Sequence, residues 1–182
     1  MNNIIKIDLT DELIRPETNV GSFDCGVSGM NNYLHYWAKE KTAEHEEFTF
    51  LVKYRGEIIG FYTIKPGIRL ENWEFGQFDT GSACEIVNFA VDKNYKERKD
   101  AIPLIGKKIF EEVILRRLRM IEEAGMPIEY IILYALPRFR LIWYYIEVLG
   151  FRRLPLIEEG KVQRRIRPRY DNQCIFLYKK IH

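Results

Sequence analysis

Apolar residues along this chain follow two spacings, and the change from one to the other predicts strands and helices. Residues 48–54 and 57–66 read FTFLVKY and EIIGFYTIKP and are joined by Arg55 and Gly56, which predicts a β-hairpin. The run IEYIILYAL at 128–136 is nearly unbroken, as in a strand covered on both faces. Further strands are predicted over residues 4–9, 85–91, 151–157 and 173–181.

Three other stretches repeat apolar residues every three or four positions, which predicts amphipathic helices. The first follows Ser28, a good N-cap residue. The second starts near Pro103, where a missing N–H costs nothing, and ends at Gly125. The third covers residues 138–150. The face of the first helix that we expect to pack on the core consists of Met30, Tyr33, Leu34 and Trp37.

The predicted elements follow the order β, α, β, β, β, α, β, α, β, β, which defines an α/β fold. The long helix connects strand 85–91 to strand 128–136, and such a crossover favours parallel pairing of the two strands. We therefore expect a mixed central sheet of about six to seven strands with helices on both faces. The length of 182 residues predicts a single domain over residues 1–182.

Composition narrows the functional classes only modestly. The chain is 47% apolar and 30% charged, as in a globular protein, and its net charge of +2 does not by itself imply a nucleic-acid partner. No stretch approaches the roughly 18 apolar residues of a membrane-spanning helix, so we expect a cytoplasmic protein without membrane contact. Three cysteines without a C-x-x-C pair and three scattered histidines predict neither a disulfide framework nor a metal site.

The stretch from Cys84 to Ile114 gives the strongest indication of ligand binding. A predicted strand leads through a basic loop into a helix start, where backbone N–H groups lack intrahelical partners and the helix dipole favours anions. The stretch lacks G-x-x-x-x-G-K-[ST] and G-x-G-x-x-G, so neither a P-loop nor a dinucleotide site is supported. The basic residues there could contact phosphate or form an ordinary solvated face: Lys96, Arg98, Lys99, Lys107 and Lys108.

The order of elements and three segments resemble the GNAT superfamily, the acetyl-coenzyme A dependent N-acetyltransferases. The segments are NFAVDKNY at 88–95, IGKKIF at 105–110 and WYYIEVLGFRRL at 143–154. The resemblance covers roughly residues 3–180. It implies acetyl-CoA as cofactor and direct transfer of the acetyl group to a primary amine of a small molecule or peptide.

In this family a strand and the following helix hold the cofactor. The resemblance implies that a backbone N–H near the strand end polarises the acetyl carbonyl. The family's loop pattern, Gln/Arg-x-x-Gly-x-Gly/Ala, falls on residues 101–106, where only Gly106 matches; backbone amides can still contact phosphate there. The residues expected to bind the cofactor are Phe89, Ala90, Val91, Arg98, Lys99, Ala101, Ile102, Leu104, Ile105, Gly106 and Lys107.

The resemblance also implies a tyrosine acid and leaves its position open. In the family the tyrosine commonly stands four residues before a glycine, which is Ile146 here, while Tyr145 and Tyr144 stand five and six before it. Either a local bulge brings Tyr145 into place, or the protein uses another acid or none, and the tyrosines pack as aromatics. Glu85 is the candidate general base, with an exposed residue at the start of a strand as the alternative.

The segment SFDCGVSGMNNYLHYWA at 22–38 is similar to the opening of acetyltransferase toxins of toxin–antitoxin pairs, which modify aminoacyl-tRNA. Relatives that are not toxins share this opening. A tRNA acceptor is therefore one alternative, and a catalytically silent regulator that binds CoA or RNA is another. The basic segment 161–170 is suited to RNA, or to a solvated loop or an arm in a homodimer. Three aromatic residues could line the acceptor pocket or anchor their loop: Trp73, Phe75 and Phe78.

Overall fold

A computed structural model describes residues 8–70, 81–160 and 173–182 of the chain. Hydrogen bonds join seven strands in the order β1-β2-β3-β4-β5-β7-β6. The β4–β5 pair is parallel, whereas β1–β2, β5–β7 and β6–β7 are antiparallel, so the predicted mixed sheet with a parallel crossover is confirmed. The strands are β1 (Leu9–Leu13), β2 (Phe48–Tyr54), β3 (Glu57–Leu70), β4 (Gly81–Val91), β5 (Tyr130–Ala135), β6 (Arg152–Arg153) and β7 (Ile175–Lys180).

Each of the three predicted helices is present, and each contains a π-helical turn in which hydrogen bonds span five residues instead of four. No helix in the described ranges is long and apolar enough to cross a membrane. The first helix is α1 (Ser28–Asn32), η1 (Tyr33–Trp37) and α2 (Ala38–Ala43); the second is α4 (Ile105–Lys108), η3 (Ile109–Ile114) and α5 (Leu115–Glu123); the third is α6 (Phe139–Trp143) and η4 (Tyr144–Val148); a short helix, α3 (Lys93–Lys96), was not predicted.

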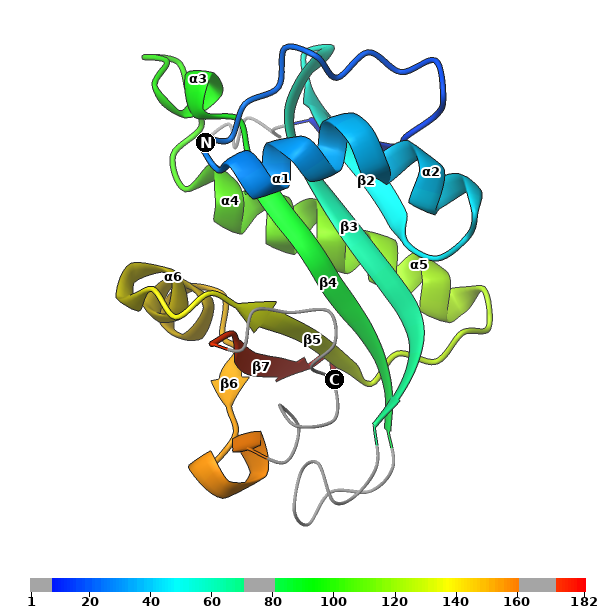
Figure 1. The fold of residues 1–182 in the computed structure, drawn as a ribbon, viewed down its shortest axis with the longest axis vertical. Coiled ribbons are helices and arrows are strands. Elements are labelled where there is room, and N and C mark those ends of the chain that lie inside the picture. Colours follow the sequence, from blue (N-terminus) through cyan, green and yellow to red (C-terminus); the bar gives the residue numbers. More distant parts are fainter. Residues whose placement is uncertain (1–7, 71–80, 161–172) are drawn as a thin grey trace, which may run out of the picture. The chain divides into compact units, whose positions relative to one another are not determined.

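The chain divides into two compact units. Residues 1–63 and 88–117 form the first unit. Its helices lie on both faces of its strands, as predicted: the helix from α1 to α2 crosses in front of the strands, and the helix that begins with α4 passes behind β3 and β4 (Figure 1). Leu34 and Ala38 of the front helix pack with Leu51 and Phe61, while Ile109 of the rear helix reaches Gly60 of β3.

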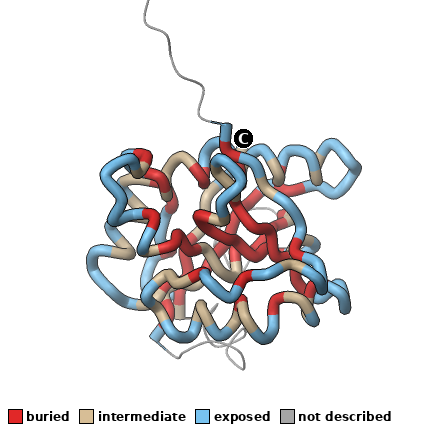
Figure 2. Tube along the Cα trace, turned by 90° about the horizontal axis from the view of Figure 1, so that it is seen from above, coloured by how far each residue is buried: buried red, intermediate tan, exposed pale blue. Residues whose placement is uncertain are grey.

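The second unit contains residues 64–87 and 118–182. Its central strand β5 lies between β4 and β7. Five of its six residues are buried, so the prediction of an interior strand is confirmed. Figure 2 draws the buried residues of the chain in red. The apolar cluster of this unit consists of Leu70, Ala83, Tyr130, Ile132, Leu154 and Phe176.

The first helix differs from its predicted pattern at two points. Val27, not Ser28, is the N-cap, since the N–H of Met30 bonds to the Val27 carbonyl. Trp37 was expected in the core but is exposed, and Ala38 is buried in its place. The π turn explains this, because an additional residue in the turn shifts the buried face by one position.

Two strand boundaries were predicted incorrectly. Strand β4 begins at Gly81, four residues before Glu85, because Ala83 already pairs with Tyr130 of β5. The stretch 151–157 was predicted as one strand, but only Arg152–Arg153 are extended and residues 156–160 are helical. Arg153 forms two hydrogen bonds, of 2.6 and 2.9 Å, to the buried carboxylate of Glu159, which ties the short strand to the following helical turn. Of the predicted strand 4–9, residues 4–7 lie outside the described ranges.

A buried ion pair fastens β1 to the second helix. The side chain of Asp11 is only 5% exposed, and its carboxylate accepts hydrogen bonds of 2.9 and 3.0 Å from Arg117. The hydroxyl of Tyr62 donates to the same carboxylate, and burial together with the Asp11 charge raises the pKa of Tyr62. The Arg117 guanidinium also lies 4.7 Å from the ring centroid of Phe50. This cluster therefore joins β1, β2, β3 and the helix.

Candidate active site and cofactor-binding loop

The end of β4 is the stretch expected to present a backbone N–H to an acetyl carbonyl. Strand β4 pairs with β5 over Ala83–Glu85 and continues beyond those pairs to Val91. The side chains of Ala90 and Val91 are buried and that of Phe89 is half-buried. Any contact of Ala90 or Val91 with a ligand therefore has to use the backbone, as the resemblance implies. The role of these residues stays a prediction.

The loop over residues 101–106 has a backbone path that its sequence did not reveal. Leu104 adopts φ 53° and ψ 36°, the left-handed conformation that glycine normally occupies, and its side chain is 69% exposed. In the family's loop pattern, position 104 is the first of the two glycines. The backbone conformation that a glycine there would permit is thus present without the glycine.

The left-handed residue also determines where the long helix begins. Helix α4 starts at Ile105, immediately after Leu104, so Pro103 lies in the preceding turn and not at the first helical position. Helix α4 has no side-chain cap. Among the described residues, the N–H groups of Ile105, Gly106 and Lys107 have no protein acceptor, and the first intrahelical donor is the N–H of Lys108, which bonds to the Leu104 carbonyl. This arrangement is suited to a phosphate.

Replacing Leu104 with glycine tests this backbone path. A left-handed leucine costs roughly 1–2 kcal/mol, and glycine loses about 0.5–1 kcal/mol more backbone entropy on folding. We expect Leu104→Gly to raise the free energy of unfolding by about 0.5 kcal/mol. Met120→Gly, at an exposed position inside α5, should lower it by about 1 kcal/mol. Urea denaturation measures both; equal losses in the two variants would contradict the left-handed assignment.

The basic residues of the loop differ in whether protein carboxylates already pair with their charges. Arg98 forms hydrogen bonds to Asp100 and Glu57, and these two carboxylates raise the pKa of its guanidinium. Arg98 is therefore already neutralised by protein groups, which weakens its predicted role in phosphate binding. Lys99 is exposed, and the ammonium of Lys107 lies 3.8 Å from Glu111. Lys99 and Lys107 are the better candidates for phosphate contact.

The hydrogen bonds of the third helix bear on which tyrosine could take the family's position. In the π turn η4, the N–H of Leu149 bonds to the carbonyl of Tyr144, five residues earlier. At the helix end the N–H of Phe151 bonds to the carbonyl of Tyr145, whereas the usual closing motif at a left-handed glycine such as Gly150 would use residue 146. The helix thus accommodates one additional residue, and Tyr145 takes the place relative to Gly150 that Ile146 would have in a regular α-helix. A local bulge, one of the alternatives left open by the sequence, is present in this helix. The role of Tyr145 as the acid stays a prediction.

The surroundings of Tyr145 define what its hydroxyl can do. The ring packs edge-on against Phe151 at 5.7 Å and against Tyr144 at 6.2 Å, and the side chain is half-buried. Desolvation, with a smaller contribution from Tyr144, raises the pKa of Tyr145. Its hydroxyl has no hydrogen-bond acceptor within the described parts of the chain. Tyr145 therefore stays protonated and can donate a hydrogen bond to a ligand.

Glu85 lies in the interior of β4 and not at its start. Its residue is 5% exposed and pairs with Ile132 of β5, so the alternative of an exposed residue at a strand start is wrong. The neighbouring Cys84 thiol is also buried, and its pKa is raised to about 12 by burial and by the Glu85 charge. A buried carboxylate can act as a proton acceptor. A catalytic role of Glu85 stays a prediction.

Sequence reasoning missed Asp92 and Tyr95, which shape the loop between β4 and the long helix. Asp92 is the N-cap of α3, and its carboxylate accepts a hydrogen bond from the N–H of Tyr95. An aspartate directly after a strand and three residues before an aromatic residue is the signal that could have predicted this short helix. The predicted RNA-contacting segment 161–170 and the aromatic residues Trp73, Phe75 and Phe78 lie outside the described residues.

Comparison with known proteins identifies the fold. No family model matches the chain, and no curated protein matches it. A solved structure described as a bacterial toxin superimposes with a TM-score of 0.71 at 17% identity, over 96% of this chain and 92% of that chain. A tyrosine-to-phenylalanine mutant of the toxin AtaT, bound to the C-terminus of the antitoxin AtaR and acetyl-CoA, gives 0.67 at 15% identity, over 96% and 94%.

A third similar structure is AtaT complexed with acetyl-methionyl-tRNAfMet, with a TM-score of 0.62 at 14% identity over 95% of each chain. These similarities extend over nearly the whole chain, and the predicted α/β fold of the GNAT type is thereby confirmed. At such identities they establish the fold and leave activity, acceptor and oligomeric state as matters for proposal.

Proposed function

We propose that the protein is an N-acetyltransferase that transfers an acetyl group from acetyl-CoA to a primary amine by direct attack. The observation that carries this proposal is the backbone path at Leu104, which leads into a helix start with three N–H groups that have no described acceptor. Backbone amides in that arrangement are suited to a pyrophosphate. The fold supports the same proposal, since the structurally similar toxin AtaT has been solved with acetyl-CoA.

In this proposal the cofactor supplies an activated acetyl thioester, and the protein residues hold and polarise it. The N–H groups of Ile105, Gly106 and Lys107 bind phosphate, and a backbone N–H in the stretch 89–91 donates to the acetyl oxygen. The amine nitrogen forms the new C–N bond and the C–S bond breaks. Glu85 accepts a proton from the amine, and Tyr145 donates its hydroxyl hydrogen to the departing sulfur. The products are an amide and the free thiol of CoA.

A thermal-shift titration with coenzyme A tests the proposal. A ligand at a hundred times its dissociation constant stabilises the folded state by about 2.7 kcal/mol. For a chain of this length that corresponds to a rise in Tm of about 5–10 °C. Pantetheine, which lacks the phosphates, is the matched control and should shift the Tm far less. No shift with CoA, or an equal shift with pantetheine, would rule out the phosphate-binding role of the loop.

A second candidate function specifies the acceptor as aminoacyl-tRNA. It is favoured by the similarity to AtaT, which was solved with acetyl-methionyl-tRNAfMet, and by the toxin-like opening at 22–38. In that case the protein would be the toxin of a toxin–antitoxin pair, and a neighbouring gene for an antitoxin would support it. Consumption of acetyl-CoA with panels of polyamines, peptides and charged tRNA separates the acceptors. Binding of CoA without turnover on any acceptor would instead favour a catalytically silent regulator.

A further inference from the structure

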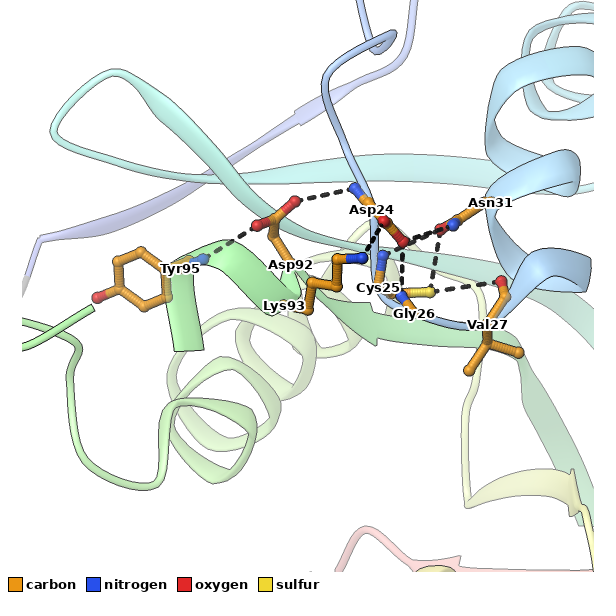
Figure 3. A network of polar contacts seen from close by, with 8 residues as sticks. All are labelled: Asp24, Cys25, Gly26, Val27, Asn31, Asp92, Lys93 and Tyr95. Carbon is orange, nitrogen blue, oxygen red and sulfur yellow. Dashed lines mark hydrogen bonds and ion pairs between the residues drawn. The ribbon is translucent and has the colours of Figure 1, made fainter. Parts of the chain in front are cut away.

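The segment before α1 is tied to the end of β4 by a network of polar contacts (Figure 3). The backbone N–H of Asp24 donates to Asp92 over 2.9 Å, and the backbone N–H of Lys93 donates to the Asp24 carbonyl over 2.8 Å. The Asp24 carboxylate is 2.6 Å from the Lys93 ammonium and accepts hydrogen bonds of 2.7 Å from Asn31 and Gly26. Because Lys93, Asn31 and Gly26 donate to it, the pKa of Asp24 is lowered to about 2.

Asp92 connects this network to Tyr95. One oxygen of its carboxylate accepts from Asp24, and the other accepts from the N–H of Tyr95 at 3.0 Å. Asp92 is buried, and it is the N-cap of the single turn α3 that carries Tyr95. The backbone of Tyr95 is therefore held by a buried carboxylate whose two oxygens each accept a hydrogen bond.

The ring and hydroxyl of Tyr95 lead directly to the candidate cofactor loop. Tyr95 is 4% exposed; Tyr54 packs edge-on against its ring and the Arg98 guanidinium lies over it. Its hydroxyl accepts a hydrogen bond of 3.2 Å from the N–H of Ile102, which is itself buried. Ile102 stands two residues before the left-handed Leu104. Among the described residues, this is the only hydrogen bond between a side chain and the backbone of residues 101–106.

We propose that Tyr95 is a positioning residue that holds the loop 101–106 in its binding conformation through the N–H of Ile102. Asp92 sets the position of Tyr95, and Asp24 links that arrangement to the start of α1. This inference rests on the proposed function only for its consequence, the affinity for CoA. The contact itself can be measured without any ligand.

The test compares Tyr95→Phe with Tyr54→Phe. The first variant keeps the buried ring and removes the acceptor of Ile102; the second removes a hydroxyl from the neighbouring ring, for which no hydrogen bond occurs within the described residues. Losing a hydrogen-bond partner of a buried amide changes an equilibrium by roughly tenfold. We expect the Ile102 amide to exchange with solvent about tenfold faster in Tyr95→Phe. The amide of Leu51, in the core of β2, should be unchanged.

The second readout is cofactor affinity. We expect Tyr95→Phe to raise the Kd for CoA and the KM for acetyl-CoA by roughly three- to tenfold. The value of kcat at saturating acetyl-CoA should stay within about twofold, because Tyr95 touches no reacting atom. Tyr54→Phe should leave all these values unchanged.

The outcomes separate the two proposals. Unchanged Ile102 exchange in Tyr95→Phe overturns the positioning role. Faster exchange with an unchanged Kd overturns it as well, because the loop would then bind CoA without being held. If the wild-type protein does not bind CoA but Tyr95→Phe still accelerates exchange at Ile102, the proposed function is wrong and the structural part of the positioning role stands.

Discussion

Replacing Tyr145 with phenylalanine is expected to lower kcat for acetyl transfer by about 100-fold, since a positioned proton donor contributes roughly 10²–10⁴-fold. The phenyl ring keeps the edge-on contact with Phe151, so the free energy of unfolding should change little. The KM for acetyl-CoA should stay nearly constant, because the hydroxyl acts on the departing sulfur and not on the phosphates. Steady-state kinetics at several acetyl-CoA concentrations separates the two constants.

Tyr144→Phe is the matched control for this prediction. Tyr144 is the adjacent tyrosine, but the additional residue in η4 favours Tyr145 over Tyr144 as the proposed acid. We expect Tyr144→Phe to retain kcat within about threefold. A large loss in Tyr144→Phe alone would show that Tyr144, and not Tyr145, is the acid. Full activity in both variants would show that the protein uses another acid or none.

The second large effect concerns stability and does not depend on the proposed function. Asp11→Asn is expected to lower the free energy of unfolding by about 3 kcal/mol, because breaking a buried ion pair leaves the partner charge without compensation. Arg117 would lose its carboxylate, and Tyr62 would lose a charged acceptor. Urea denaturation at neutral pH, with the slope compared between variants, measures the change.

Glu12→Gln is the control for Asp11→Asn. Glu12 is the next residue of the same strand and forms an ion pair of 2.6 Å with Lys53, but this pair lies at the surface. An exposed pair contributes about 0–1 kcal/mol, so the variant should be nearly as stable as the wild type. Equal losses in the two variants would mean that the burial of Asp11 has no energetic consequence.

Much of the fold was predictable because short-range patterns determine it. The hairpin β2–β3 follows from two apolar runs around Arg55 and Gly56, and both turn residues adopt positive φ, 52° and 83°, as the favoured hairpin turn requires. The glycine at 125 ends the long helix with φ 98°, also as predicted. The sheet order agrees with the predicted crossover because a helix between two strands leaves little choice of pairing.

The errors share a different cause, since each depends on contacts that the spacing of apolar residues does not contain. Trp37 and Ala38 exchange roles because a π turn forms where the helix packs on Leu51 and Phe61. The strand predicted over 151–157 is cut short because Arg153 pairs with Glu159. Local propensity does not contain these contacts, and tertiary packing overrides it.

The candidate site shows the same division between local pattern and packing. The sequence by itself determined the order of elements, the strand-to-helix stretch from Cys84 to Ile114 and the two tyrosines near Gly150, because periodicity and chain order carry that information. Only the tertiary structure decided that Leu104 adopts the conformation of a glycine and that a π turn forms at the two tyrosines. The physical reason is that a left-handed residue and a π turn are unfavourable locally and persist only where surrounding contacts, such as Ile102 with Tyr95 and Tyr145 with Phe151, accompany them.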